Sequence, residues 1–181
     1  MNSNKEWYTV CSENNIMLSQ CDDTHDFKIT FSVLEKYENI VEIIQQNKLF
    51  ELIQLLNADI IEECSENVVN NNNNVVLKLN TKELNINNKL YNNLVIMLNY
   101  SKNIDNNICG LISIDSTNNK VSNNEIQLEQ FSLIITDNKS KTNFDINYTI
   151  ANNNITNLNV SEKFISLYLK KIFYRLHQYF N

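Results

Sequence analysis

The order of apolar segments along the chain is the feature that most constrains its fold. Phe27–Val33 alternates apolar and polar residues, which is the period of a half-buried strand, and helical periodicity replaces this alternation over about 34–58. The chain closes with an amphipathic helix expected over about 161–180. Between the helical segments lie six short apolar runs, separated by polar turns: 59–64, 75–80, 91–100, 108–115, 126–137 and 143–151. This β-αα-β6-α order predicts an α+β fold, with a curved antiparallel sheet of about six to seven strands gripping the long C-terminal helix.

The C-terminal helix carries a clear apolar stripe. Four aliphatic residues spaced three or four positions apart fall on one helical face: Ile165, Leu169, Ile172 and Leu176. We expect this face to pack on the sheet. The remaining side of the helix carries five polar residues, which we expect to face solvent: Lys170, Lys171, Arg175, His177 and Gln178.

Asparagine is the dominant residue, with about 36 copies against a single glycine and no proline. Because glycine is scarce, asparagine has to occupy the turn positions that need a positive φ, which it tolerates better than most residues. The run Asn70–Asn74 is predicted to be a flexible loop within one domain that covers 27–181. Residues 1–26 are predicted to form an N-terminal extension that contains a short hairpin, with strands at Glu6–Cys11 and Ile16–Cys21.

Charge and hydropathy exclude several classes of partner. The net charge is −6, the pI is about 4.9 and there is one arginine, so a phosphate backbone would be repelled. We therefore expect no nucleic-acid partner. No segment approaches the roughly 18 apolar residues of a membrane-spanning helix, so no stable membrane insertion is expected. The polar N-terminal residues lack the apolar core of a signal peptide, which favours a cytoplasmic protein.

No pattern of residues indicates a reaction. Neither Cys64 nor Cys109 has a histidine next to it in the sequence, and the four cysteines show no C-x-x-C spacing. The segment Cys21–Asp26 brings a thiol, carboxylates and His25 together, but it lacks the glycine and closing glutamate of a calcium loop and a second Cys/His cluster for zinc, so we expect a solvated turn. One glycine cannot form a glycine-rich phosphate loop. We therefore expect no catalytic residue, no metal ligand and no cofactor, and a protein that is not an enzyme.

The stretch FKITFSVLEKYENIVEIIQQNKLFELIQLL, which begins at Phe27, resembles the opening of proteins of the helix-grip superfamily. This group includes START-like lipid-transfer domains and polyketide-cyclase-like proteins. The resemblance covers about 27–180 and rests on element order, since no family motif is matched and the glycine-rich loop of one branch is missing. A pleckstrin-like barrel with a capping helix is the alternative fold, and it requires the two early helices to be an insertion.

The resemblance implies a binding site for a hydrophobic small molecule or lipid between the last helix and the sheet. Eight residues would line it: Ile165, Tyr168, Leu169, Ile172 and Leu176 on the helix, and Phe144, Ile146 and Tyr148 on the sheet. The Tyr168 hydroxyl would orient the polar end of the ligand. The alternative is a non-enzymatic adaptor module that fills this space with its own side chains and binds another protein.

Overall fold

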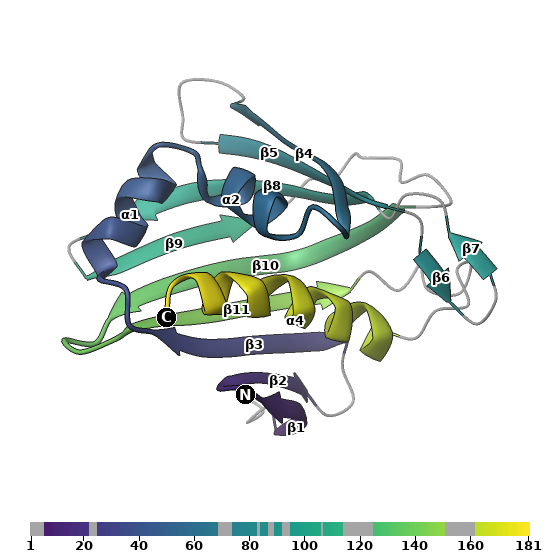
Figure 1. Ribbon diagram of the computed structural model, residues 1–181, viewed down its shortest axis with the longest axis horizontal. Helices are drawn as coiled ribbons and strands as arrows, with labels where there is room; N and C mark the ends of the chain where they lie inside the picture. Colours follow the sequence, from purple (N-terminus) through teal and green to yellow (C-terminus); the bar gives the residue numbers. More distant parts are fainter. Residues whose placement is uncertain are drawn as a thin grey trace, which may run out of the picture.

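The computed structural model describes residues 6–21, 25–68, 74–82, 84–86, 89–91, 95–105, 107–113, 125–150 and 162–181. The predicted flexible loop Asn70–Asn74 lies outside the described residues, except for Asn74. The described part contains three helices and a large sheet, arranged in the predicted order (Figure 1).

Nine strands of the described chain form one sheet, in the spatial order β1-β2-β3-β11-β10-β9-β8-β5-β4. Their bounds in this order are Trp7–Glu13, Ile16–Cys21, Asp26–Val33, Thr142–Ile150, Glu125–Asp137, Ile108–Ser113, Val95–Ile104, Asn74–Thr81 and Ile61–Val68. Neighbours in this order are antiparallel. A separate small hairpin pairs β6 (Leu84–Ile86) with β7 (Lys89–Tyr91).

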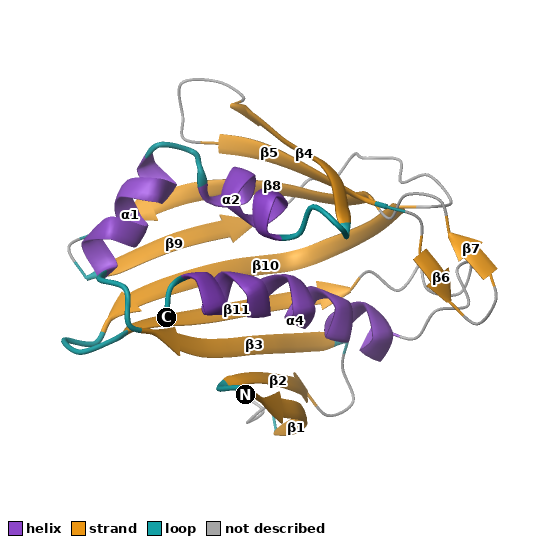
Figure 2. Cartoon of the chain, in the orientation of Figure 1, coloured by secondary structure: helices purple, strands orange, loops and turns teal. Residues whose placement is uncertain are grey.

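The helices α1 (Tyr37–Gln45), α2 (Leu49–Leu56) and α4 (Glu162–Tyr179) lie on one face of the sheet (Figure 2). The break between α1 and α2 falls at Asn47, whose φ is 58°. Asn14 and Asn15, which turn the β1–β2 hairpin, also have positive φ. Asparagine thus occupies three of the five described non-glycine positions with positive φ, and the other two are Gln130 and Lys139.

The predicted fold class is confirmed: a curved, almost wholly antiparallel sheet holds the long C-terminal helix across it. The seven strands predicted from 27 to 151 are all present, although the third after the helices runs over Val95–Ile104 instead of starting at Tyr91. The sheet reaches nine strands because β2 pairs with β3, so that the N-terminal hairpin extends the same sheet. Ile16 and Leu18 of β2 are fully buried in the common core.

A bulge in β10 helps the sheet to curve. The register between β10 and β11 shifts between Glu129 and Ser132, and Gln130 has a φ of 48°. Such bulges bend a strand and increase its local twist. Before the bulge, β10 pairs directly with β8 in parallel, beside Val95–Met97, and after it β10 pairs with the short β9.

The buried core lies between the helices and the sheet. Every second residue of β3 and β11 points inward, and the two strands match inward positions: Phe31 lies opposite Phe144, Ile29 opposite Ile146, and Phe27 opposite Tyr148. This alternation, visible in the sequence, places a continuous apolar surface under α4.

Two residues of α4 that were predicted to face solvent are buried, so that prediction is wrong for them. Lys170 and His177 are only 7% and 8% exposed. The reason is the N-terminal hairpin, which brings β1 and β2 alongside this flank of α4. The Nζ atom of Lys170 lies 3.0 Å from the Sγ atom of Cys11 on β1.

Candidate functional site

The candidate site is the interface between α4 and the inward face of β3 and β11. The four aliphatic stripe residues of α4 are all buried, as are Phe144, Ile146 and Tyr148 on β11. Their placement follows from the helical spacing of the stripe and from the strand alternation of β11. Helix and strand positions that are far apart in sequence are thereby brought to one apolar interior.

Aromatic rings pack closely under the C-terminal half of α4. The Phe31 and Phe144 rings stack with centroids 4.6 Å apart, and Phe180 stacks on Phe144 at 6.2 Å. The rings of His177 and Phe31 are nearly perpendicular, with centroids 5.6 Å apart. Close aromatic contacts of this kind fix side-chain positions. The C-terminal end of the interface is therefore held by the protein's own side chains.

Two buried hydroxyl groups lie under the N-terminal half of α4. Tyr148 and Ser166 are 2% and 0% exposed, and neither hydroxyl has a hydrogen-bond partner among the described residues. Burial raises the pKa of Tyr148 well above its ordinary value, and the neighbouring Ser166 side chain partly opposes that rise. The side chain of Tyr168, the residue predicted to supply the orienting hydroxyl, is half-buried as a whole, although its hydroxyl oxygen is buried.

Sequence reasoning did not single out Ser166. The signal that could have found it is its position: Ser166 stands next to Ile165 and seven residues before Phe173, on a helical face that also turns inward. A small polar residue on such a face can be buried. Its proximity to Tyr148 on β11, however, depends on how α4 packs against the sheet.

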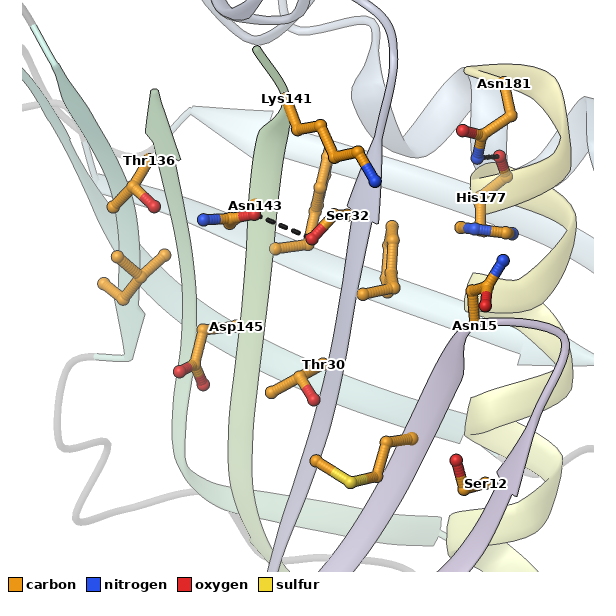
Figure 3. A pocket seen from close by; sticks show the side chains of 14 residues that line it. Ser12, Asn15, Thr30, Ser32, Thr136, Lys141, Asn143, Asp145, His177 and Asn181 are labelled. Atoms are coloured by element: carbon orange, nitrogen blue, oxygen red, sulfur yellow. Dashed lines mark hydrogen bonds between the residues drawn. The ribbon is translucent and has the colours of Figure 1, made fainter. Parts of the chain in front are cut away.

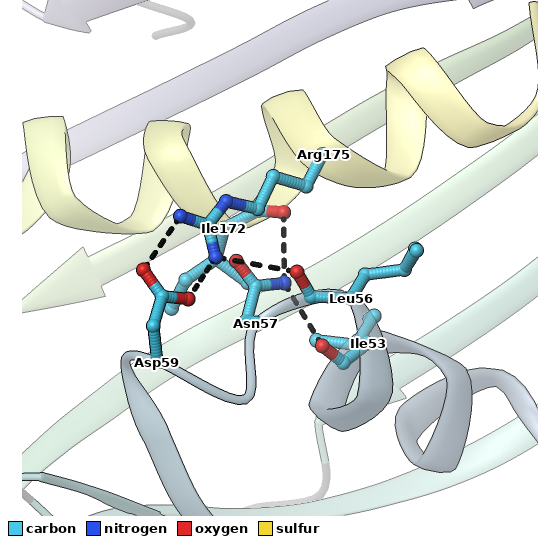
Figure 4. A network of polar contacts seen from close by, with 6 residues as sticks. All are labelled: Ile53, Leu56, Asn57, Asp59, Ile172 and Arg175. Atoms are coloured by element: carbon cyan, nitrogen blue, oxygen red, sulfur yellow. Dashed lines mark hydrogen bonds and ion pairs between the residues drawn. The ribbon is translucent and has the colours of Figure 1, made fainter.

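A polar network fastens the end of α2 to the middle of α4 (Figure 4). The side-chain amide of Asn57 donates hydrogen bonds to the carbonyl oxygens of Ile53, at 2.9 Å, and Ile172, at 3.3 Å. Arg175 donates to the Leu56 carbonyl at 3.2 Å and forms a two-point ion pair with Asp59. The guanidinium group lowers the pKa of Asp59 to about 2. These contacts hold α4 against α2 and so close one side of the interior.

A second, more polar feature lies mainly on the outward face of the sheet. It is a hollow of about 900 Å³, and Figure 3 shows side chains from β3, β10, β11, the β1–β2 turn and the end of α4 around it. Its polar lining includes Thr30, Ser32, Asn143, Asp145 and His177. Several of these groups already bind protein atoms: Ser32 donates to Asn143 at 2.7 Å, and Asp145 pairs with Lys28 at 2.6 Å. Most of this hollow lies on the outward face, whereas the predicted apolar site occupies the inward face, and Phe144 borders both.

Among the described helices, none has the length and apolar character needed to span a membrane.

Cys109, a possible nucleophile by residue type, is buried in β9, and this burial raises its thiol pKa to about 11. A thiol that stays protonated is a poor nucleophile.

No protein-family profile matches the sequence, and no curated protein matches it. Solved structures do match the fold. The human StarD13 lipid transfer and protein localization domain superposes with a TM-score of 0.64 at 12% identity, over 98% of this chain and 90% of that one. Human StAR-related lipid transfer protein 5 gives 0.59 at 9% identity, over 97% and 90% of the two chains. Human STARD10 gives 0.62 at 12% identity, over 93% and 71%. The chain therefore has a START-like helix-grip fold.

Proposed function

We propose that the protein binds a hydrophobic small molecule or lipid between α4 and the inward face of the sheet, and that it acts as a carrier without catalysing a reaction. The observation that carries the proposal is the apolar stripe of α4 laid over the aromatic and aliphatic side chains of β3 and β11. Sites for apolar ligands are typically lined in this way, with few polar groups.

Two further observations support this proposal. The structures that share the fold are named as lipid transfer domains or proteins. In addition, the Cys109 thiol is masked by burial. We propose a cytoplasmic carrier with no cofactor and no nucleic-acid partner, in keeping with its acidic charge.

The experiment is a search for ligand carried by the full chain. The purified protein is weighed by native mass spectrometry, and organic extracts of it are examined for lipid. It is then titrated with a fluorescent fatty-acid probe. We expect a co-purified apolar molecule or saturable uptake of the probe, at one molecule per chain.

A pair of matched variants locates the site. Ile146→Trp enlarges an inward residue of β11, whereas Ile134→Trp makes the same change on the outward side of β10, opposite Asp145. Ile146→Trp should abolish binding while Ile134→Trp retains it, with circular dichroism confirming that both fold. A folded wild-type protein that carries no lipid and ignores the probe would instead favour the adaptor alternative.

A further inference from the structure

Two hydroxyl groups are buried side by side in an otherwise apolar part of the candidate site. Tyr148 enters from β11 and Ser166 from α4, and both side chains are more than nine-tenths buried. Within the described residues neither hydroxyl meets the geometry of a hydrogen bond, although the Ser166 side chain lies close enough to the Tyr148 hydroxyl to lower its pKa. Buried hydroxyl groups are nearly always hydrogen-bonded, because burial without a partner is unfavourable. A mutual hydrogen bond would use one of the two hydroxyl hydrogens and leave the other without an acceptor, so the pair can bind a third polar group.

The surroundings of the two hydroxyls are apolar. The ring of Phe27 stacks on the Tyr148 ring at 5.8 Å, and on α4 Ser166 lies between the buried Ile165 and the exposed Leu167. The hydroxyl of Tyr148 stays protonated, since burial raises its pKa. The pair thus offers neutral donors and acceptors, without negative charge of its own.

Charged groups nearby are directed elsewhere. The buried cation closest to Ser166 on α4 is Lys170, one turn later, and its ammonium group lies 3.0 Å from the Cys11 sulfur. Lys163 is exposed, and Glu162 at the start of α4 pairs with His25. A buried anionic group needs a compensating positive charge. None of the charged residues named above points a cation toward the two hydroxyls.

We infer that Tyr148 and Ser166 form a recognition site for one uncharged oxygen, a hydroxyl or carbonyl group, at the end of an otherwise apolar ligand. This inference rests on the proposed function and narrows it. Such a site should prefer neutral ligands, such as long-chain alcohols, to fatty acids, which are ionised at neutral pH. It should also prefer them to hydrocarbons, which cannot form a hydrogen bond with either hydroxyl. We therefore assign the selection between ligands to Tyr148 and Ser166, in place of Tyr168.

The test compares three ligands of equal chain length: dodecan-1-ol, dodecanoate and dodecane. Each displaces N-phenyl-1-naphthylamine from the full-length protein at neutral pH. Wild type should bind the alcohol about tenfold more tightly than the other two. Tyr148→Phe and Ser166→Ala should each weaken alcohol binding about three- to tenfold, the range expected for one hydrogen bond, and leave dodecane binding unchanged.

Tyr37→Phe is the matched control, because the Tyr37 hydroxyl donates to the Asp105 carbonyl at 3.0 Å, away from the pair. It should leave the ligand order unchanged but lower the melting temperature, since it removes a hydrogen bond. Tyr148→Phe should not lower the melting temperature of the ligand-free protein. A drop as large as that of Tyr37→Phe would reveal an internal partner for the Tyr148 hydroxyl and overturn the inference.

The ligand order separates this inference from the proposed function. If all three ligands bind equally, if dodecanoate binds best, or if the two variants keep the alcohol preference, the recognition site is refuted and the carrier function stands. If the protein binds neither the fluorescent probe nor any of the three ligands, the carrier function is refuted together with the site.

Discussion

The side chain of Asn57, at the end of α2, reaches the backbone of α4 and donates a hydrogen bond to the carbonyl of Ile172 at 3.3 Å. Ile172 belongs to the apolar stripe, so this contact fixes the helix that covers the candidate site. The same amide also donates to Ile53 at 2.9 Å, within α2. One fully buried polar residue therefore joins two helices that are more than a hundred residues apart in sequence.

Asn57→Leu should lower the free energy of unfolding by about 1–3 kcal/mol, because it leaves the Ile172 carbonyl without this donor in a buried setting. Chemical denaturation measures the change. Asn39→Leu is the control: the Asn39 side chain binds Glu35 on the surface, and its loss should cost less than about 1 kcal/mol. Equal effects of the two changes would contradict a structural role for Asn57.

Leu169→Ala should destabilise the protein by about 2–5 kcal/mol, the usual range for removing a buried leucine side chain. Leu167→Ala removes the same atoms two residues earlier on the same helix, where the side chain is 38% exposed, and should cost less than about 1 kcal/mol. Urea denaturation of both variants provides the comparison. An unchanged midpoint for Leu169→Ala would show that the stripe does not face the sheet.

Lys170→Ala should cost about 1–3 kcal/mol of stability, whereas Lys171→Ala should change it by less than about 0.5 kcal/mol. The difference arises because the N-terminal hairpin covers Lys170, while Lys171 faces solvent. Thermal denaturation at matched pH provides the measurement. If removing residues 1–21 leaves the protein folded, Lys170→Ala should become nearly neutral in the shortened chain.

The ion pair of Arg175 with Asp59 should make stability depend on acid pH. The pKa of Asp59 is lowered from 3.8 to about 2, chiefly by the Arg175 hydrogen bonds. Its contribution is therefore complete above the unfolded value of 3.8 and is lost as the pH falls through about 2. Carbon-13 NMR titration of the Asp59 carboxyl group should show the low pKa. Arg175→Gln should return it toward 3.8, and Lys171→Gln should move it much less.

Cys109 should resist alkylation by iodoacetamide at neutral and mildly alkaline pH in the folded protein. Burial raises its pKa to about 11, so the reactive thiolate is scarce until the pH approaches that value. Cys11, which is only half-buried, should be modified before Cys109. Peptide mass spectrometry after timed labelling distinguishes the two. Rapid labelling of Cys109 in the native state would show that β9 opens readily.

The spacing of apolar residues along the chain predicted the element order and the apolar stripe from Ile165 to Leu176. These features depend on the period of side-chain direction along a helix or strand, which neighbouring residues reveal. The inward alternation of β11 was readable for the same reason.

Which polar residues are buried, and which groups they contact, depends on the packing of segments that are distant in sequence. Lys170 and His177 looked solvent-facing by helical period, yet the pairing of β2 with β3 brings the N-terminal hairpin over them. The contacts of Tyr148 with Ser166 and of Asn57 with Ile172 likewise join distant segments. Periodicity describes the faces of one element, whereas the partner of each face depends on how the sheet curves and where α4 crosses it.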